Sequence, residues 1–250
     1  MITNASSRTN LHEIAPGIYR INTPIQIPGG PDFNFNQYLV ADDEPLLFHT
    51  GPRRMFPLVA EAIGSVLPLE RLRYVAFSHF EADECGSLND FLAAAPAAVP
   101  VCSQVAAMVS VNDFADRPAR ALAEGEVLRT GRRAFKWLDA AHVPHQWENG
   151  FMMELETRTL LCGDLFTQGG SGAVAITESD ILGPSEAFRQ PMDYYAHAPQ
   201  TGATLERLAR EQPQTLACMH GSAWRGDGAS LLRALARSLA DGRAPMGKAA

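Results

Sequence analysis

The stretch SHFEADECGS, residues 78–87, places one histidine, three carboxylates and a thiol within ten positions. It follows RYVAFS, a continuous apolar run typical of a buried strand. If the chain stays extended after this strand, His79, Glu81 and Asp83 project to the same side, because side chains alternate along a strand. The spacing therefore predicts a group of metal-binding side chains at the end of a buried strand.

Three further apolar segments also end in residue types that bind metals. KWLDAAHVPH ends in His142 and His145, TRTLLCGD ends in Asp164, and TLACMH ends in His220. Imidazole and carboxylate groups are the usual ligands of zinc, iron and manganese in proteins. A short HxExD pattern can arise by chance, but four such strand ends together predict one metal centre built from distant parts of the chain.

The order of these motifs resembles the metallo-β-lactamase superfamily over nearly the whole chain. HxExD is followed by a later histidine, then GD, then a C-terminal HG, as in the binuclear site of that superfamily. Its hydrolases usually carry HxHxDH, whereas this chain has Glu81 at the middle position. Glutamate there is similar to the flavodiiron and oxygen-binding di-iron branch, and so is the separation of nineteen residues between His145 and Asp164.

The resemblance implies an α+β fold, the metallo-β-lactamase-like αββα sandwich, in a single domain. The residue patterns agree, because predicted strands come in two batches that are each followed by predicted helices. We expect the domain to span residues 1–245 and residues 246–250 to form a flexible tail.

The resemblance also implies how the side chains are divided between two metals, when it is carried over position by position. One metal would be held by His79, Glu81 and His145, the other by Asp83 and His220, with Asp164 bridging them. Because His145 has the family spacing, we expect His142 to lie behind the ligands instead.

Two positions depart from the family pattern. Glu84 replaces the second histidine of HxExDH, and it could either bind a metal as a carboxylate or turn away. In LLFHTG, His49 stands where the superfamily usually has an aspartate. We expect His49 to hydrogen-bond one of the ligands, since metal ligands are commonly oriented by such outer partners.

The four cysteines show neither the spacing of a disulfide scaffold nor that of a zinc ribbon. Three of them lie beside candidate ligands, so a role for these thiols at the metals stays open, and Cys85 is a candidate for the layer behind the ligands. Buried cysteine commonly acts as a small apolar residue, so packing is the preferred interpretation. The four residues are Cys85, Cys102, Cys162 and Cys218.

The candidate ligands include three carboxylates, Glu81, Asp83 and Asp164. Hard anionic oxygens suit iron or manganese better than zinc, and non-haem iron reacts with O2 in mixed histidine and carboxylate sites. We therefore expect two iron ions, with manganese or zinc as alternatives. The chain has no Gly-rich flavin or dinucleotide fingerprint and no CxxC pair, so we expect no flavin in this chain and a separate electron-donor protein.

These observations predict a non-haem di-iron protein that binds and reduces O2, or NO or peroxide, as an oxygen sensor or a partner-dependent oxidoreductase. The alternative is a binuclear metal-dependent hydrolase of an ester, thioester, lactone or phosphodiester, in which the metals activate a water. A loop over residues 168–200, with Phe188, Tyr194 and Tyr195, would then line the substrate pocket. Glu81 argues against this alternative. A degenerate site in a binding module is also less consistent with six candidate ligands.

Charge and hydropathy exclude several classes of partner. The net charge is −7 and no Lys/Arg-rich run is present, so we expect no nucleic-acid binding. No apolar run reaches the ~18 residues that a membrane span requires, and the first residues lack a secretory signal pattern. The expected location is therefore the cytoplasm, with no membrane association, and a homodimer is possible.

Overall fold

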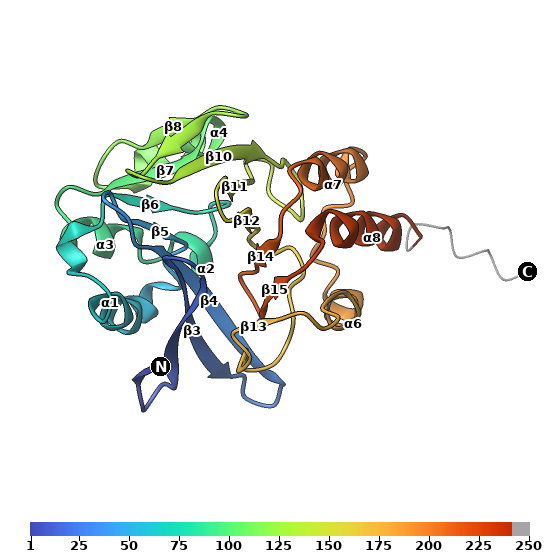
Figure 1. Ribbon diagram of the computed structural model, residues 1–250, viewed down its shortest axis with the longest axis horizontal. Coiled ribbons are helices and arrows are strands. Elements are labelled where there is room, and N and C mark those ends of the chain that lie inside the picture. Colours follow the sequence, from blue (N-terminus) through green and yellow to red (C-terminus); the bar gives the residue numbers. More distant parts are fainter. Residues whose placement is uncertain (242–250) are drawn as a thin grey trace, which may run out of the picture.

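The chain is organised around two facing β-sheets, as the computed structural model of residues 1–241 shows (Figure 1). The first sheet has eight strands in sequence order, antiparallel from β1 to β5 and parallel from β5 to β8. Its strands are β1 (Ile2–Asn4), β2 (Thr9–Ala15), β3 (Ile18–Gln26), β4 (Asp32–Val40), β5 (Leu46–Phe48), β6 (Tyr74–Ala76), β7 (Val99–Ser103) and β8 (Arg120–Leu122).

The second sheet has seven strands in the order β13-β15-β14-β12-β11-β10-β9. Its centre contains the parallel pair of β12 and β14, which is flanked on one side by antiparallel neighbours β11 and β10. The strands are β9 (Val127–Arg129), β10 (Ala134–Asp139), β11 (Gly150–Glu154), β12 (Thr159–Leu161), β13 (Ile176–Thr177), β14 (Thr215–Ala217) and β15 (Ala223–Arg225).

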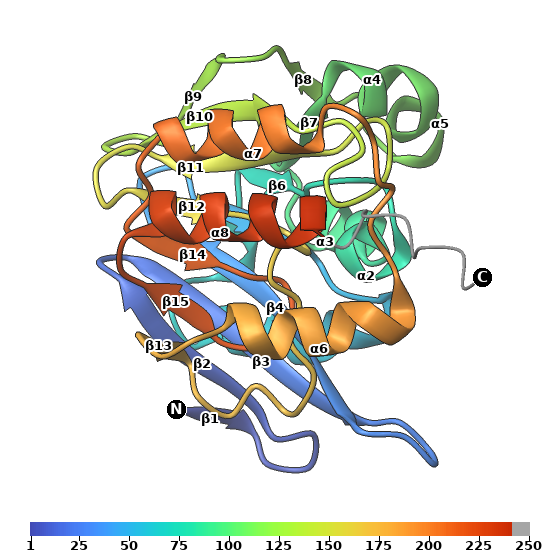
Figure 2. The ribbon, with the colours of Figure 1, turned by 90° about the vertical axis from the view of Figure 1, so that its right-hand side faces the viewer.

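Helices cover the outer face of each sheet (Figures 1 and 2). The first sheet carries α1 (Phe56–Gly64), α2 (Ala82–Cys85), α3 (Leu88–Ala94), α4 (Gln104–Ala106) and α5 (Asn112–Phe114), with a π-helical turn at Ala107–Val111 and 3-10 turns at Arg53–Met55 and Leu69–Arg71. The second carries α6 (Leu182–Met192), α7 (Thr201–Arg210) and α8 (Gly228–Asp241). This is the αββα sandwich that the sequence predicts.

Strand alternation builds the three apolar layers of the sandwich. In β4, Leu39 joins the core between the first sheet and its helices, while Tyr38 packs between the sheets. In β12, Leu160 faces the helices of the second sheet and Leu161 faces the first sheet. Both faces of these central strands are therefore buried, which explains their continuous apolar runs.

One segment differs from its expected structure. Residues 168–200, expected to form a loop, contain the two-residue strand β13 and the three-turn helix α6. Gly183, Pro184 and Pro191 within α6 weaken the helical signal in the sequence. Proline is tolerated there because Pro184 lies in the first turn and Pro191 in the last.

The expected domain boundary at residue 245 and the expected tail at 246–250 lie outside the described residues. Within residues 1–241, no helix combines the length and apolar character that a membrane crossing would need.

Candidate metal centre

The parallel strand pairs bring the candidate side chains to one edge of the sandwich. His79 follows β6, which pairs in parallel with β5, and Asp164 and His220 follow the parallel pair β12 and β14. The carboxyl ends of parallel strands meet at the same edge of a sheet. Main-chain hydrogen bonds between the sheets, such as Gly150 N–H to the Ser78 carbonyl at 2.9 Å, hold the two edges together.

Four of the candidate side chains form a cluster of the size of a metal site. One donor atom from each of His79, Glu81, His145 and Asp164 lies within 4.8 Å of all the others. Glu81 Oε2 lies 2.8 Å from His79 Nε2 and 3.1 Å from His145 Nε2. Hydrogen bonds from His145 and His79 lower the pKa of Glu81 to about 2. The glutamate is thus held ionised between two imidazoles.

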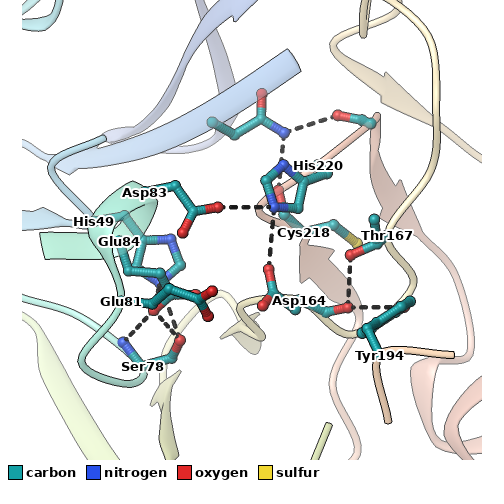
Figure 3. A network of polar contacts seen from close by, with 12 residues as sticks. His49, Ser78, Glu81, Asp83, Glu84, Asp164, Thr167, Tyr194, Cys218 and His220 are labelled. Atoms are coloured by element: carbon teal, nitrogen blue, oxygen red, sulfur yellow. Dashed lines mark hydrogen bonds and ion pairs between the residues drawn. The ribbon is translucent and has the colours of Figure 1, made fainter. Parts of the chain in front are cut away.

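Asp164 connects the other members of this cluster to a second group, and Figure 3 shows its contact with His220 of that group. Its Oδ2 is 3.4 Å from His145 Nε2, while its Oδ1 is 3.2 Å from His220 Nε2. His220 Nε2 is also 3.5 Å from Asp83 Oδ2. Asp164 therefore occupies the position between two groups of side chains that a bridging ligand would occupy.

The three histidines of the centre share one hydrogen-bonding pattern, in which Nδ1 points outward and Nε2 inward. Each Nδ1–H donates to an oxygen behind the ring, at 2.8 to 3.0 Å. Metal-ligating histidines are almost always held in this way, because the outward hydrogen bond fixes the ring and its tautomer. The donor and acceptor pairs are His79 with Asn149 Oδ1, His145 with the Tyr194 carbonyl, and His220 with the Asn34 carbonyl.

The electrostatics of the centre favour a positive charge. Burial by itself would lower the pKa of His79, but the surrounding carboxylates, of which Glu84 has the largest effect, raise it to about 10. Burial also opposes the protonation of His220, and the hydrogen bond with Asp164 contributes most to raising its pKa to about 10. A cation can satisfy the same carboxylates, so the donor set fits a metal.

A small cavity of about 200 Å³ opens over the centre. Its aromatic wall includes Phe33, whose ring lies 4.5 Å from that of His220 and is stacked on Phe188 at 5.5 Å between centroids. Phe188 and Tyr194 line it, as expected for the 168–200 segment, whereas Tyr195 is not among the lining residues and is buried in the apolar core. Sites for drug-sized ligands are usually about 300–1,000 Å³, so this cavity suits a small molecule.

Glu84 does not join the cluster of candidate ligands. Its Oε2 accepts hydrogen bonds from the main-chain N–H groups of Ser78 and His79, at 3.1 Å each, and from the Ser78 hydroxyl. The side chain is fully buried. Of the two orientations left open by the sequence, the structure has the one in which this carboxylate turns away, because it is used to hold the turn after β6.

The two departures from the family pattern contact each other. His49 Nε2 lies 3.1 Å from Glu84 Oε2 and 3.3 Å from Ser78 Oγ, and both His49 and Glu84 are fully buried. His49 therefore connects to the candidate ligand His79 through Ser78 and Glu84 and not by a direct hydrogen bond. Figure 3 shows His49, Glu84 and Ser78 grouped on the side of the centre away from His220.

His142 and the cysteines have lesser connections to the cluster. Among residues 1–241, no hydrogen bond or ion pair joins the His142 imidazole to a candidate ligand, and its main-chain N–H donates to the Gln146 carbonyl. The Cys85 thiol donates to the Glu81 carbonyl at 3.3 Å, and burial raises its pKa. Cys162 and Cys218 are buried with their sulfur atoms 3.9 Å apart.

Sequence reasoning missed the outer partners of the histidines. Asn149 lies in HQWENG, four residues after His145. The only sequence feature that could have indicated its contact with His79 is an asparagine directly before a strand. Asn34 and Tyr194 contribute main-chain carbonyls. No residue pattern marks a carbonyl acceptor, because every residue has one.

Comparison with known proteins connects this geometry to a family. The model of the ODP family beta lactamase matches residues 33–221. The rubredoxin-oxygen oxidoreductase of Megalodesulfovibrio gigas is 28% identical over 205 residues, which are 77% of this chain and 49% of that protein. The anaerobic nitric oxide reductase flavorubredoxin of Salmonella arizonae is 24% identical over 224 residues, 83% of this chain and 45% of that protein. The chain thus spans about half the length of these curated relatives.

Solved structures of the same kind share the fold. The rubredoxin oxygen:oxidoreductase of Desulfovibrio gigas superposes with a TM-score of 0.80 at 22% identity, over 93% of this chain and 62% of that one. A 1–254 fragment of the putative diflavin flavoprotein A 5 of Nostoc sp. PCC 7120 gives 0.79 at 20% identity, over 93% and 94%. The match over residues 33–221 shows that this chain belongs to the ODP family of beta-lactamases, and its homology is to the metallo-β-lactamase-like core of flavodiiron proteins.

Proposed function

We propose that this chain holds two iron ions and reduces O2 or NO. The observation that carries the proposal is Glu81, which lies between the inward Nε2 atoms of His79 and His145 where zinc hydrolases of the superfamily have histidine. The names of the two curated relatives, an oxygen oxidoreductase and a nitric oxide reductase, support this chemistry. They give no support to the hydrolase alternative.

The proposed ligands follow the two groups of side chains described above. Asp164 would be the ligand shared by the two metals, since its two oxygens face different groups of side chains. When bound, the iron ions supply the electrons that reduce the diatomic substrate. His79, Glu81 and His145 would hold the first metal, and Asp83 and His220 would hold the second.

Two aromatic rings and a main-chain carbonyl shape the cavity and orient one of the candidate ligands. Phe33 and Phe188 form an apolar wall of the cavity beside His220. The carbonyl of Tyr194 holds the His145 ring and so fixes the direction of its Nε2. A cavity of about 200 Å³ is large enough to admit a diatomic molecule.

Electrons for the reaction come, in this proposal, from a separate donor protein. The name of one relative, rubredoxin-oxygen oxidoreductase, pairs rubredoxin with oxygen, and an acidic chain with net charge −7 would favour a donor with a basic docking surface. Without an electron donor, reversible binding of O2 would make the protein an oxygen sensor. A homodimer stays a prediction, which light scattering of the purified protein can measure.

Metal content is the decisive measurement. We expect about two iron atoms per chain in protein purified from iron-supplied cells, together with a near-ultraviolet ferric band that bleaches on anaerobic reduction and returns with O2. Manganese in place of iron would change the metal but keep the ligand set. Stoichiometric zinc without a redox-linked spectrum would overturn the proposal. It would favour the alternative, hydrolysis of an ester, thioester, lactone or phosphodiester.

A further inference from the structure

The carboxylate of Glu84 joins three separate parts of the chain. It belongs to α2, it accepts main-chain hydrogen bonds from Ser78 and His79 beyond β6, and it contacts His49 beyond β5. A carboxylate that accepts several N–H hydrogen bonds without water is held in one orientation. Glu84 therefore fixes the main chain at the residue that supplies the first candidate ligand.

His49 supports Glu84 from the opposite side. Its main-chain N–H donates to the Ala76 carbonyl at 2.8 Å, and its φ of 66° turns the chain so that the imidazole reaches Glu84. Left-handed backbone is uncommon for residues other than glycine, so the conformation is stabilised by its surroundings. The Thr50 N–H donates to the Glu84 carbonyl at 2.7 Å, which fastens the same two segments a second time.

Glu84, and the Ser78 hydroxyl that contacts His49, both lie close to the imidazole of His79. Glu84 Oε2 is 3.5 Å from His79 Nδ1, and Ser78 Oγ, which also contacts His49, is 3.1 Å from the same nitrogen. Together with the hydrogen bond to Asn149, these contacts hold the ring from behind while Nε2 faces the centre. A shift of Glu84 would move the main chain and the ring of His79 together.

We propose that His49 and Glu84 form a single acid–base pair that positions His79, and that the acid and the base of this pair are interchangeable. The resemblance described above implies an acid at the position of His49 and a histidine at the position of Glu84, and in this chain the two residues contact each other at 3.1 Å. Each replacement therefore compensates for the other. This inference rests on the proposed function for the role of His79 as a ligand, but not for the pairing itself.

The physical basis is that a buried charge without a partner is costly. Removing one member of a buried pair leaves the other uncompensated and destabilises a protein strongly. His49→Asp would place two carboxylates against each other, and Glu84→His would place two imidazoles against each other, with both sites fully buried. The exchanged double variant would restore one acid and one base.

The test is a double-variant cycle with metal affinity as the readout. Metal-free wild type, His49→Asp, Glu84→His and His49→Asp/Glu84→His are titrated with Co²⁺ against a competing chelator, and the visible Co²⁺ spectrum is recorded. Loss of an outer partner of a metal ligand costs about 10–100-fold in affinity. We expect each single variant to bind at least about tenfold more weakly, and the double variant to recover most of the loss along with the wild-type spectrum.

Two further variants separate positioning from folding. Glu84→Gln keeps the size of the side chain and should fold, because one amide oxygen can still accept the Ser78 and His79 N–H bonds. It should weaken Co²⁺ binding less than Glu84→His does. Glu154→Gln is the matched control, since Glu154 is also a fully buried carboxylate that accepts main-chain N–H bonds, at the far end of β11. We expect it to lower stability to urea and leave Co²⁺ affinity unchanged.

The pairing inference is overturned if the double variant binds Co²⁺ no better than the weaker single variant, or if Glu84→Gln and Glu154→Gln behave alike. A different result would overturn the proposed function. If wild type binds Co²⁺ with the expected rescue but is isolated from cells with zinc and no redox spectrum, the pair is retained and the iron chemistry is not.

Discussion

At the residue scale, the candidate centre depends on hydrogen bonds made behind each imidazole as much as on the ligands. The ends of apolar strands in the sequence marked His79, Glu81 and Asp164, and the spacing of the resembled family favoured His145 over His142; the structure brings one donor atom of each of these four residues together. The direction of Glu84 could not be predicted, because it depends on hydrogen bonds to main-chain groups that form only when α2 packs against the turn after β6.

Asn149 provides a residue-scale prediction. Its Oδ1 accepts from His79 Nδ1 at 3.0 Å and its amide donates to the Val143 carbonyl at 2.6 Å. We expect Asn149→Ala to weaken metal binding by about 10–100-fold, because the His79 ring loses the acceptor that orients it. Chelator competition measures the loss. Asn112→Ala, at an exposed asparagine that caps the Ala119 N–H, should have no effect on affinity, and equal effects of the two variants would contradict the prediction.

At the element scale, strands were easier to predict than the helix that covers the cavity. The apolar runs that became β6, β12 and β14 are buried on both faces, so their sequences contain little else than apolar residues. In contrast, α6 carries Gly183, Pro184 and Pro191, and its apolar residues do not follow a clear helical repeat. Its position is set by packing over the second sheet, which the local sequence does not encode.

The role of α6 at the cavity can be tested through Phe188. Phe188→Ala removes the ring that stacks on Phe33, so one wall of the cavity opens to solvent. We expect the metal content at saturation to stay the same while a chelator removes the metals several-fold faster, since water and chelator reach them more easily. Stopped-flow absorbance measures this rate. Gln190→Ala, exposed on the same helix, is the control, and equal rates in both variants would show that α6 does not shield the site.

At the scale of the whole molecule, the αββα fold was predictable because the motif order of the chain matches its family over most of its length. The way in which the two sheets pack against each other could not be predicted from the sequence. His79 and Glu81 come from the first sheet and His145 and Asp164 from the second, and their separations depend on the apolar layer between the sheets, which includes Phe48 and Trp137. Such packing arises from many contacts and has no local sequence pattern.

The pH dependence of stability is a property of the whole molecule. In the metal-free protein the pKa values of His79 and His220 are raised from 6.5 to about 10, so folding favours their protonated forms. The stability that results is fully present below pH 6.5 and is lost as the pH rises through about 10. We expect urea unfolding of metal-free protein to show this decline, and His79→Gln to show a smaller one. In metal-loaded protein the decline should be absent, because metal replaces the protons on these histidines; a decline of the same size there would contradict the prediction.

His220 is the last of the candidate ligands along the sequence, so it is the last of them to be synthesised. His220 follows β14, and β14 pairs with β12, the strand that precedes Asp164. During synthesis on the ribosome, the residues around His79 emerge long before those of the second sheet, and domains generally fold as units once their sequence is available. The nascent chain therefore has an incomplete set of candidate ligands until β14 and His220 have left the exit tunnel, so a metal that needs the whole set would be captured late in synthesis.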